Sequence, residues 1–187
     1  DRRCRILRSA EKQAMQARLV GLYRDHVLLD FDQSLDPNRY WVLEHQGDIV
    51  AGAQVERCEW RIRRLPGFSG ALLVHAVSRT PVLRGVFNAY RCRFLKLGNL
   101  YAQPGQEPLL FHLMESILAY NSTKTAMIFQ DPRSPVFRRI AANGQFGVLN
   151  AGINPRVHVM AARIGLTEKQ HQDLEDKPVM ISPGDIG

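Results

Sequence analysis

The chain has 187 residues, of which 45% are hydrophobic and 23% are charged, and this balance predicts a single globular domain with a sizeable core. No apolar run reaches the roughly 18 residues that a membrane-spanning helix needs, so we expect no membrane partner. The formal net charge of +7 favours an anionic partner, which would be a phosphorylated cofactor, a nucleic acid or an acidic protein. The alternative is a basic surface that only keeps the protein in solution.

The three cysteines, Cys4, Cys58 and Cys92, are odd in number and widely spaced, and no Cys-x-x-Cys pair occurs. This pattern indicates a cytoplasmic protein with free thiols, and it argues against a zinc site.

The first part of the chain predicts a strand, a helix and a β-hairpin. Residues 3–7 fit a short edge strand, and Ser9 is a typical N-cap for a helix from Ala10 to about Val27. After a loop, the runs Tyr40–Leu43 and Ile49–Val55 alternate apolar residues around a Gly-containing connection, which predicts a hairpin. We expect its second strand to continue to Trp60.

Residues 61–93 contain several glycines and prolines and are expected to form an insert before the next strand, which begins at Phe94. Within the insert, Ala71–Val77 fits a buried strand and Pro81–Tyr90 fits a short helix. The insert either covers a substrate site or serves only as packing.

A strand, a tight turn, a helix and a second strand are predicted between Phe94 and Phe129. Pro108 suits the first turn of the helix, and Glu107 complements the positive end of its dipole. One apolar helical face is formed by Leu109, Leu110, Leu113, Met114, Ile117 and Leu118. The short apolar run Ala126–Phe129 predicts a buried parallel strand, so the whole is a right-handed crossover whose first turn can bind an anion.

The C-terminal part predicts a helix, two strands and a last helix. Pro135 would begin the first helix, and Gly144 would end it. The strands are expected over 146–149 and 156–162, a helix follows from Thr167 to Leu174, and residues 179–187 are expected to be a flexible tail.

This order of elements resembles the GNAT family of N-acetyltransferases over nearly the whole chain. The resemblance implies an α/β (α+β) fold in one domain, 1–187, with a mixed, splayed sheet of about six to seven strands flanked by helices. It places the insert between the third and fourth strands. In this family the sheet opens beside the fourth strand to admit acetyl-CoA.

Local motifs support the resemblance. The segment 100–104, Leu-Tyr-Ala-Gln-Pro, is similar to the strand end and proline before the family's pyrophosphate loop. Asp131, Ser134 and Phe137 match the spacing of its Asn-x-x-Ala-x-x-Phe-Tyr segment, and Gly144-Gln-Phe is similar to its Gly-Phe with one residue inserted. The resemblance implies acetyl-CoA or another acyl-CoA as cofactor. The residues it implies for cofactor binding are Leu100, Tyr101, Ala102, Gln103, Pro104, Gly105, Gln106, Glu107, Asp131, Arg133, Ser134, Phe137 and Arg138.

The chain departs from the family pattern at the pyrophosphate loop. Only Gly105 lies between Pro104 and the helix, where the family has two or three glycines. Free N–H groups of Gly105, Gln106 and Glu107 could still bind a diphosphate, although the Glu107 carboxylate adds a negative charge there. The alternative is that Gly105 only makes the tight turn of the crossover.

A second departure is Arg138, which stands where the family usually has the tyrosine that protonates the leaving thiolate. A guanidinium is a poor proton donor, but it can stabilise negative charge or hold a phosphate. Arg138, Arg133 and Arg139 either grip the cofactor in this way or are solvated side chains on an exposed helix face.

Three residues are candidates for proton transfer. Glu56, near the end of a central strand, can act as general base for the amine, and His75 is the rival base. Tyr101 can donate or relay a proton. Each also has an ordinary structural interpretation: an outward strand residue, a histidine of the insert and a core tyrosine.

The resemblance therefore implies an N-acyltransferase that moves an acetyl or other acyl group from CoA to a primary amine by direct attack. The acceptor would be a small-molecule or peptide amine, and the protein a cytoplasmic monomer or homodimer. The alternative is a catalytically inactive GNAT-like binding or regulatory module, which both departures favour. Arginines cluster at 2–8 and 61–64, but aromatic residues are not interleaved with them, so we expect no nucleic-acid partner.

Overall fold

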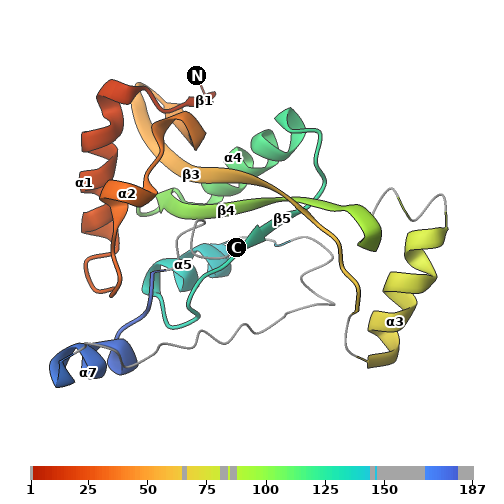
Figure 1. The fold of residues 1–187 in the computed structure, drawn as a ribbon. Coiled ribbons are helices and arrows are strands. Elements are labelled where there is room, and N and C mark those ends of the chain that lie inside the picture. Colours follow the sequence, from red (N-terminus) through yellow and green to blue (C-terminus); the bar gives the residue numbers. More distant parts are fainter. Residues whose placement is uncertain are drawn as a thin grey trace.

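The computed structural model describes residues 2–64, 67–80, 84, 88–143, 146 and 167–180. Its centre is a five-stranded sheet in the order β1-β2-β3-β4-β5 (Figure 1). The strands are β1 (Arg2–Ile6), β2 (Tyr40–His45), β3 (Asp48–Trp60), β4 (Cys92–Ala102) and β5 (Ala126–Ile128). Neighbouring strands are antiparallel from β1 to β4, whereas β5 is parallel to β4.

This mixed sheet confirms the predicted α/β class. The described residues hold five strands, fewer than the six to seven expected. The two further strands predicted over 146–149 and 156–162 fall outside the described ranges, except for Phe146.

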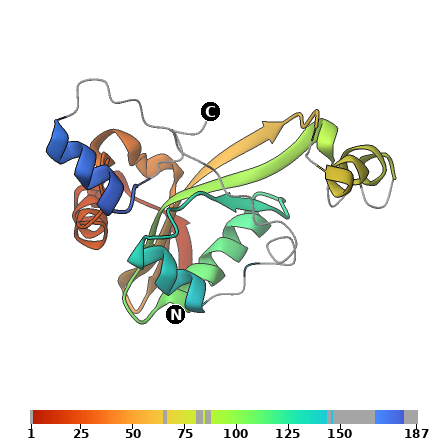
Figure 2. The ribbon, with the colours of Figure 1, turned by 90° about the horizontal axis from the view of Figure 1, so that it is seen from below.

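Helices cover both faces of the sheet (Figure 2). The helices are α1 (Lys12–Leu22), α2 (Phe31–Ser34), α3 (Gly67–His75), α4 (Glu107–Tyr120), α5 (Pro135–Asn143) and α7 (Glu168–Asp176). Short 3-10 turns are η1 (Ser9–Glu11), η2 (Pro37–Arg39), η3 (Val77–Arg79) and η5 (Ala89–Arg91). Figure 2 shows α1 and α2 on one side of the sheet and α4 and α5 on the other, so the central strands are buried on both faces.

The predicted hairpin and crossover helix are confirmed. Gln46 and Gly47 join β2 to β3 with φ values of 54° and 87°, as a two-residue hairpin turn requires. The apolar face of α4 is buried, and Leu110, Leu113 and Ile117 are 0% exposed. Because this face packs against β2, β3 and β4, α4 fixes the turn before it at the end of β4.

The insert is helical where a strand was predicted. Residues 67–75 form α3, so the expected buried strand Ala71–Val77 is wrong. A short apolar run fits either structure, and here the run lies outside the sheet, where no strand is available to pair with it. The expected helix over 81–90 falls largely outside the described residues, and β4 begins at Cys92, two residues before the predicted Phe94.

The strands β3 and β4 extend beyond the rest of the sheet. Pairing of β2 with β3 stops at Tyr40–Gln54, and pairing of β5 with β4 begins only at Leu95. Both strands continue as a two-stranded ribbon that ends with the pair Trp60–Cys92. We call residues 57–93 the arm; Figures 1 and 2 show α3 at its end, away from the other helices.

Both ends of the described chain are held by specific contacts. The Arg5 guanidinium bonds the Glu11 carboxylate at 2.7 Å and the Glu44 carboxylate at 2.8 Å, and it lowers the pKa of Glu11 to about 2. Val179 and Met180, which open the predicted tail, hydrogen-bond with Val27 or bridge to it. The rest of that tail, 181–187, lies outside the described residues.

All three cysteines have free thiols. Among the helices of the described ranges, none has both the length and the apolarity to span a bilayer. Those ranges also hold no cluster of His, Cys, Asp or Glu side chains that could bind a metal ion.

Candidate functional site

A β-bulge interrupts β4 in the middle of the molecule. Gly98 faces Gln54 and Tyr101 faces Gly52, so Asn99 and Leu100 together oppose one residue of β3. Asn99 has a φ of 47°, in the left-handed region that asparagine tolerates better than most residues. The signal in the sequence is Gly98-Asn99 inside an otherwise apolar run.

Buried tyrosines hold the bulge in place. The Tyr40 hydroxyl donates to the Asn99 carbonyl at 2.9 Å, and the Tyr23 hydroxyl donates to the Leu100 carbonyl at 2.8 Å. Burial raises the pKa of both tyrosines, so both hydroxyls remain protonated donors. The bulge is therefore fixed from the side of α1 and β2.

A buried amide pair connects the bulge to α2. The Asn99 side-chain amide donates to the Gln54 side-chain oxygen at 3.2 Å and to the Ser34 carbonyl at 3.3 Å. The same Gln54 oxygen accepts from the Asp36 backbone N–H at 3.2 Å. Asn99 Oδ1 is buried and has no hydrogen-bond partner within the described part of the chain.

The sheet is open beside the bulge. The last pair of β4 with β5 is Leu97–Ile128, but β4 continues to Ala102. From Gly98 to Ala102, the side of β4 that faces β5 has no strand partner among the described residues.

The turn after β4 is exposed and leads directly into α4. The Gln106 N–H donates to the Gln103 carbonyl at 2.8 Å, and Gly105 has a φ of 82°. The N–H of Gln106 is therefore already used and is not one of the three free donors that the sequence suggested. Gly105 and Glu107 remain as donors next to the helix N-terminus. Glu107 is only 7% exposed, so its carboxylate does not occupy the surface of the turn.

Tyr101 lies at the bulge and is 8% exposed. The Arg18 guanidinium lies 6.0 Å from the centre of its ring and donates to the Ile49 carbonyl at 2.9 Å. The candidate proton donor is thus on the strand that borders the opening, next to α1.

Glu56 is also near the bulge, and it is paired with two cations. Its carboxylate is 3.3 Å from the ammonium of Lys96, which lies opposite Glu56 on the neighbouring strand β4. The Arg39 guanidinium lies 3.8 Å from the same carboxylate. The Lys96 side chain is only 5% exposed. Sequence reasoning missed Lys96, although a lysine between Leu95 and Leu97 in a buried strand, opposite a carboxylate, is a visible signal.

His75 is not brought together with these residues. It is an exposed residue of α3, at the end of the arm.

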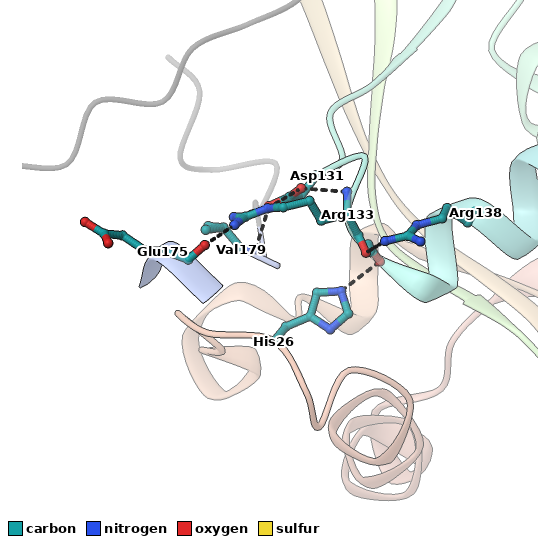
Figure 3. Close-up of polar contacts among 7 residues, drawn as sticks. His26, Asp131, Arg133, Arg138, Glu175 and Val179 are labelled. Atoms are coloured by element: carbon teal, nitrogen blue, oxygen red, sulfur yellow. Dashed lines mark hydrogen bonds and ion pairs between the residues drawn. The ribbon is translucent and has the colours of Figure 1, made fainter. Parts of the chain in front are cut away.

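Asp131 and Arg133, which follow β5 and were predicted to bind the cofactor, hold parts of the protein together (Figure 3). Burial, the largest single effect, raises the pKa of Asp131, but hydrogen bonds from Arg133 and from the Val179 N–H outweigh it and lower the pKa overall. The Arg133 guanidinium bonds Asp131 at 2.8 Å and donates to the Glu175 carbonyl at 2.5 Å. This group ties α7 and the segment after it to the start of α5.

Arg138 and Ser134 complete that unit. The Arg138 guanidinium donates to the Arg133 carbonyl at 2.7 Å, and the Ser134 hydroxyl accepts from the Phe137 N–H at 3.2 Å as a cap of α5. The ring of Phe137 lies 6.2 Å from that of Phe146. Arg139 is exposed on α5. These contacts occupy part of the hydrogen-bonding capacity that a cofactor would use.

One buried contact here could not be predicted from the sequence. His26 Nε2 lies 2.7 Å from Ser134 Oγ, and His26 Nδ1 is buried without a hydrogen-bond partner in the described ranges. Burial lowers the pKa of His26, and it outweighs the raising effects of a contact with the Tyr23 backbone and of the Asp131 and Asp25 carboxylates. His26 is therefore a neutral histidine that connects the end of α1 to α5.

The strand order and directions agree with those expected from the resemblance to the GNAT family. Antiparallel strands are followed by a parallel β5, which is reached through α4 and pairs with β4 only as far as Leu97, before the bulge.

Solved structures to which the chain is similar include a GCN5-related N-acetyltransferase from Ralstonia eutropha, with 16% identity and a TM-score of 0.49, over 88% of this chain and 100% of that one. A second is a predicted acetyltransferase from Clostridium acetobutylicum, solved with acetyl-CoA, with 11% identity and a TM-score of 0.46, over 88% and 97%. A third is an aminoglycoside acetyltransferase from an uncultured soil sample, with 11% identity and a TM-score of 0.41, over 89% and 99%. These likenesses concern the fold alone. No protein-family model and no curated protein matches the sequence.

Proposed function

We propose that the chain is an N-acyltransferase of the GNAT type, which moves an acetyl or other acyl group from CoA to a primary amine by direct attack. One observation supports this above the others. β4 bulges, separates from β5 and runs straight into an exposed turn and the N-terminus of a long helix. An acyl-CoA needs this combination of an open strand edge for its thioester arm and free N–H groups for its diphosphate.

The residues of the turn fit the diphosphate. Gly105 and Glu107 offer backbone N–H groups at the positive end of the α4 dipole, and the residues from Gln103 to Gln106 are exposed. Acyl-CoA bound there supplies the activated thioester. Backbone N–H groups on the open side of Gly98–Ala102 would hold its carbonyl and stabilise the oxyanion.

Proton transfer would involve Glu56 and Tyr101. Glu56 would accept a proton from the attacking amine, and Lys96 would position its carboxylate. Tyr101, next to the bulge, would supply a proton to the leaving thiolate, since an arginine at position 138 is a poor proton donor. The free thiols suit a cytoplasmic enzyme.

The test has two steps. CoA or acetyl-CoA at about 100 times its dissociation constant should stabilise the fold by roughly 2.7 kcal/mol, seen as a higher melting temperature, whereas ATP serves as a polyanion control. Release of free CoA from acetyl-CoA is then measured with a panel of small amines and amine-bearing peptides. Binding with amine-dependent release supports the enzyme. Binding without turnover would indicate an inactive module, and no binding would overturn the proposal.

A further inference from the structure

The positive charge of this chain is concentrated in one segment. Residues 57–93, the arm, contain eight arginines, no lysine and one carboxylate, Glu59, so the formal charge of the arm is +7. This equals the formal net charge of the whole chain, and the remainder is therefore neutral overall. The charge does not belong to the turn after β4, where CoA is proposed to bind.

The arm is also separated from that turn in space. Figure 2 shows the ribbon of β3 and β4 projecting from the body, with α3 at its end. The arm includes the first two residues of β4, Cys92 and Arg93, whereas the turn follows Ala102 at the other end of this 11-residue strand. At about 3.3 Å per residue, the two ends are roughly 30 Å apart.

The end of the arm is apolar and lies between arginines. The 14 residues from Leu65 to Ser78 include no Asp, Glu, Lys or Arg, and they stand between Arg64 and Arg79. Leu72 of α3 is 51% exposed. Trp60, the last residue of β3, is 37% exposed, and Tyr90, in the turn η5 just before β4, is 43% exposed.

Several arginines on the arm face solvent. Arg61, Arg63 and Arg64 are exposed, and the last two line a hollow of about 500 Å³ beside α3. Arg91 and Arg93, by contrast, share the Glu59 carboxylate at 3.0 and 2.7 Å. The exposed cations nearest the apolar end are therefore not the ones that pair with Glu59.

We propose that the arm docks on an anionic phospholipid surface. The uncharged end with α3 would enter the headgroup region, and the arginines would contact lipid phosphates around it. A segment that combines apolar residues, exposed Trp and Tyr, and a cluster of cations is typical of binding at the membrane interface. This proposal departs from the sequence-based expectation of no membrane partner, which rested only on the lack of an apolar run long enough to span a bilayer.

The charge and the apolar end of the arm favour a bilayer over two other partners, a second copy of the chain and a nucleic acid. A second copy of the chain would bring two arms of charge +7 together, which is repulsive. A nucleic acid would match the charge but would leave the apolar end of α3 against a polar backbone or in water. A bilayer satisfies both properties at once.

Binding is measured by co-sedimentation of the full chain with vesicles. We expect binding to vesicles of equal parts phosphatidylglycerol and phosphatidylcholine, weaker binding at high salt, and little binding to phosphatidylcholine alone. Absence of binding to the anionic vesicles, or equal binding to both kinds, would overturn the proposal. Salt-sensitive binding to a single-stranded RNA without vesicle binding would assign the arm to nucleic acid instead.

Matched variants locate the contact. Arg63→Gln with Arg64→Gln should lower the partition coefficient about 30-fold, since each surface cation contributes about five-fold. The control, Arg24→Gln with Lys124→Gln, removes the same charge from exposed sites of the body and should have a much smaller effect. Equal losses in the two pairs would mean a general charge effect and would contradict docking through the arm.

The apolar contribution is tested separately. Leu72→Ser should weaken binding about 5-fold, whereas Val20→Ser, on α1 and 46% exposed, should not. In a Trp41→Phe background Trp60 is the only tryptophan, and its emission should shift to shorter wavelength with anionic vesicles and be quenched by brominated lipid. CoA binding should be unchanged in all these variants. Unchanged Trp60 emission together with unchanged Leu72→Ser binding would overturn insertion of the arm.

Discussion

Gly105 is the residue whose backbone the proposed cofactor site depends on most directly. Its φ of 82° is in the left-handed region, and a side chain added there would meet no atom within 4 Å. Gly47, in the β2–β3 turn, has a φ of 87° and is equally open. The two glycines therefore have a similar φ, but only Gly105 lies in the proposed cofactor site.

Replacing either glycine by valine should lower the free energy of unfolding by about 1–2 kcal/mol, because a β-branched residue is strained in this region. Only Gly105→Val should also weaken CoA binding, measured by calorimetry, since it displaces N–H groups of the turn. Gly47→Val is the control for general destabilisation. Unchanged CoA affinity in Gly105→Val would place the diphosphate elsewhere.

Glu56 has a structural contribution that can be separated from a catalytic one. Glu56→Gln should lower the free energy of unfolding by about 1–3 kcal/mol, because it removes the carboxylate next to the buried Lys96 ammonium. Adding Lys96→Met should restore much of that loss in urea unfolding. Glu59→Gln, in an exposed ion pair, should have a much smaller effect on the free energy of unfolding.

If Glu56 is the general base, acyl transfer stays low in the double variant even when stability returns. Recovery of turnover with stability would show that Glu56 acts only through the fold.

His26 should make stability depend on pH. Burial lowers its pKa in the folded protein below the value of about 6.5 in the unfolded chain, so the unfolded chain binds the proton first as the pH falls. Stability is therefore complete above about pH 6.5 and declines below it, until the folded-state pKa is reached. The slope can reach about 1.4 kcal/mol per pH unit.

His26→Gln should reduce that slope in urea unfolding measured from pH about 7.5 to about 5. His112→Gln, at an exposed site on α4, should leave it as in the wild type. A wild-type slope in His26→Gln would assign the acid sensitivity to another group.

At the scale of elements, the packing of Tyr40 of β2 beside the bulge of β4 requires a glycine at position 52 of β3. A Cβ on Gly52 would lie 2.6 Å from Cε1 and from Oη of Tyr40. Tyr40 is completely buried and its hydroxyl bonds the bulge carbonyl of Asn99. No rotation of the ring alone removes such a contact in a packed core.

Gly52→Ala should therefore destabilise the protein by about 1–3 kcal/mol through overpacking and loss of the Tyr40 hydrogen bond. Gly21→Ala in α1, where an added Cβ meets nothing within 4 Å, should instead stabilise it by about 0.5–1 kcal/mol. Thermal or urea unfolding measures both. Equal effects of the two substitutions would contradict the packing described here.

The elements that could be predicted from sequence are those with a long periodic signal or a turn of known chemistry. The α4 helix had six apolar residues at helical spacing, and the β2–β3 hairpin had a glycine between alternating runs. In contrast, α3 is a short apolar run without clear periodicity, and its helical state is decided by its position outside the sheet. The capping box of Thr167 and Gln170 at α7 shows that local signals near a helix start are also reliable.

The layout of the candidate site could be predicted in part. The turn at Gly105 and the strand end at Tyr101 follow from local sequence, and both lie at the opening of the sheet. The roles of Arg133 and Asp131 could not be judged, because their partners Glu175 and Val179 are more than 40 residues away in the chain. The Gln54–Asn99 amide pair and the His26–Ser134 contact are equally non-local, and such pairs leave no pattern in one sequence.

At the scale of the whole molecule, net charge is informative only when it is assigned to a segment. In the sequence analysis the net charge of +7 favoured an anionic partner, but it was not assigned to any part of the chain. In the fold, the arm holds the entire excess, and the body that holds the opened sheet is neutral overall. The cofactor binding that we propose would then rely on local N–H groups and not on long-range attraction.

The short contact between β4 and β5 has a kinetic consequence. Within the described ranges, only the pairs from Leu95–Ala126 to Leu97–Ile128 join β5 to the antiparallel part of the sheet. Separating β5 and α5 from that part would break few backbone hydrogen bonds, together with the His26–Ser134 contact and the packing of α5 on α4. We therefore expect this half to open at a cost below that of global unfolding. A product held between the two strands would leave at the rate of that opening, which makes release, and not chemistry, a natural limit on turnover.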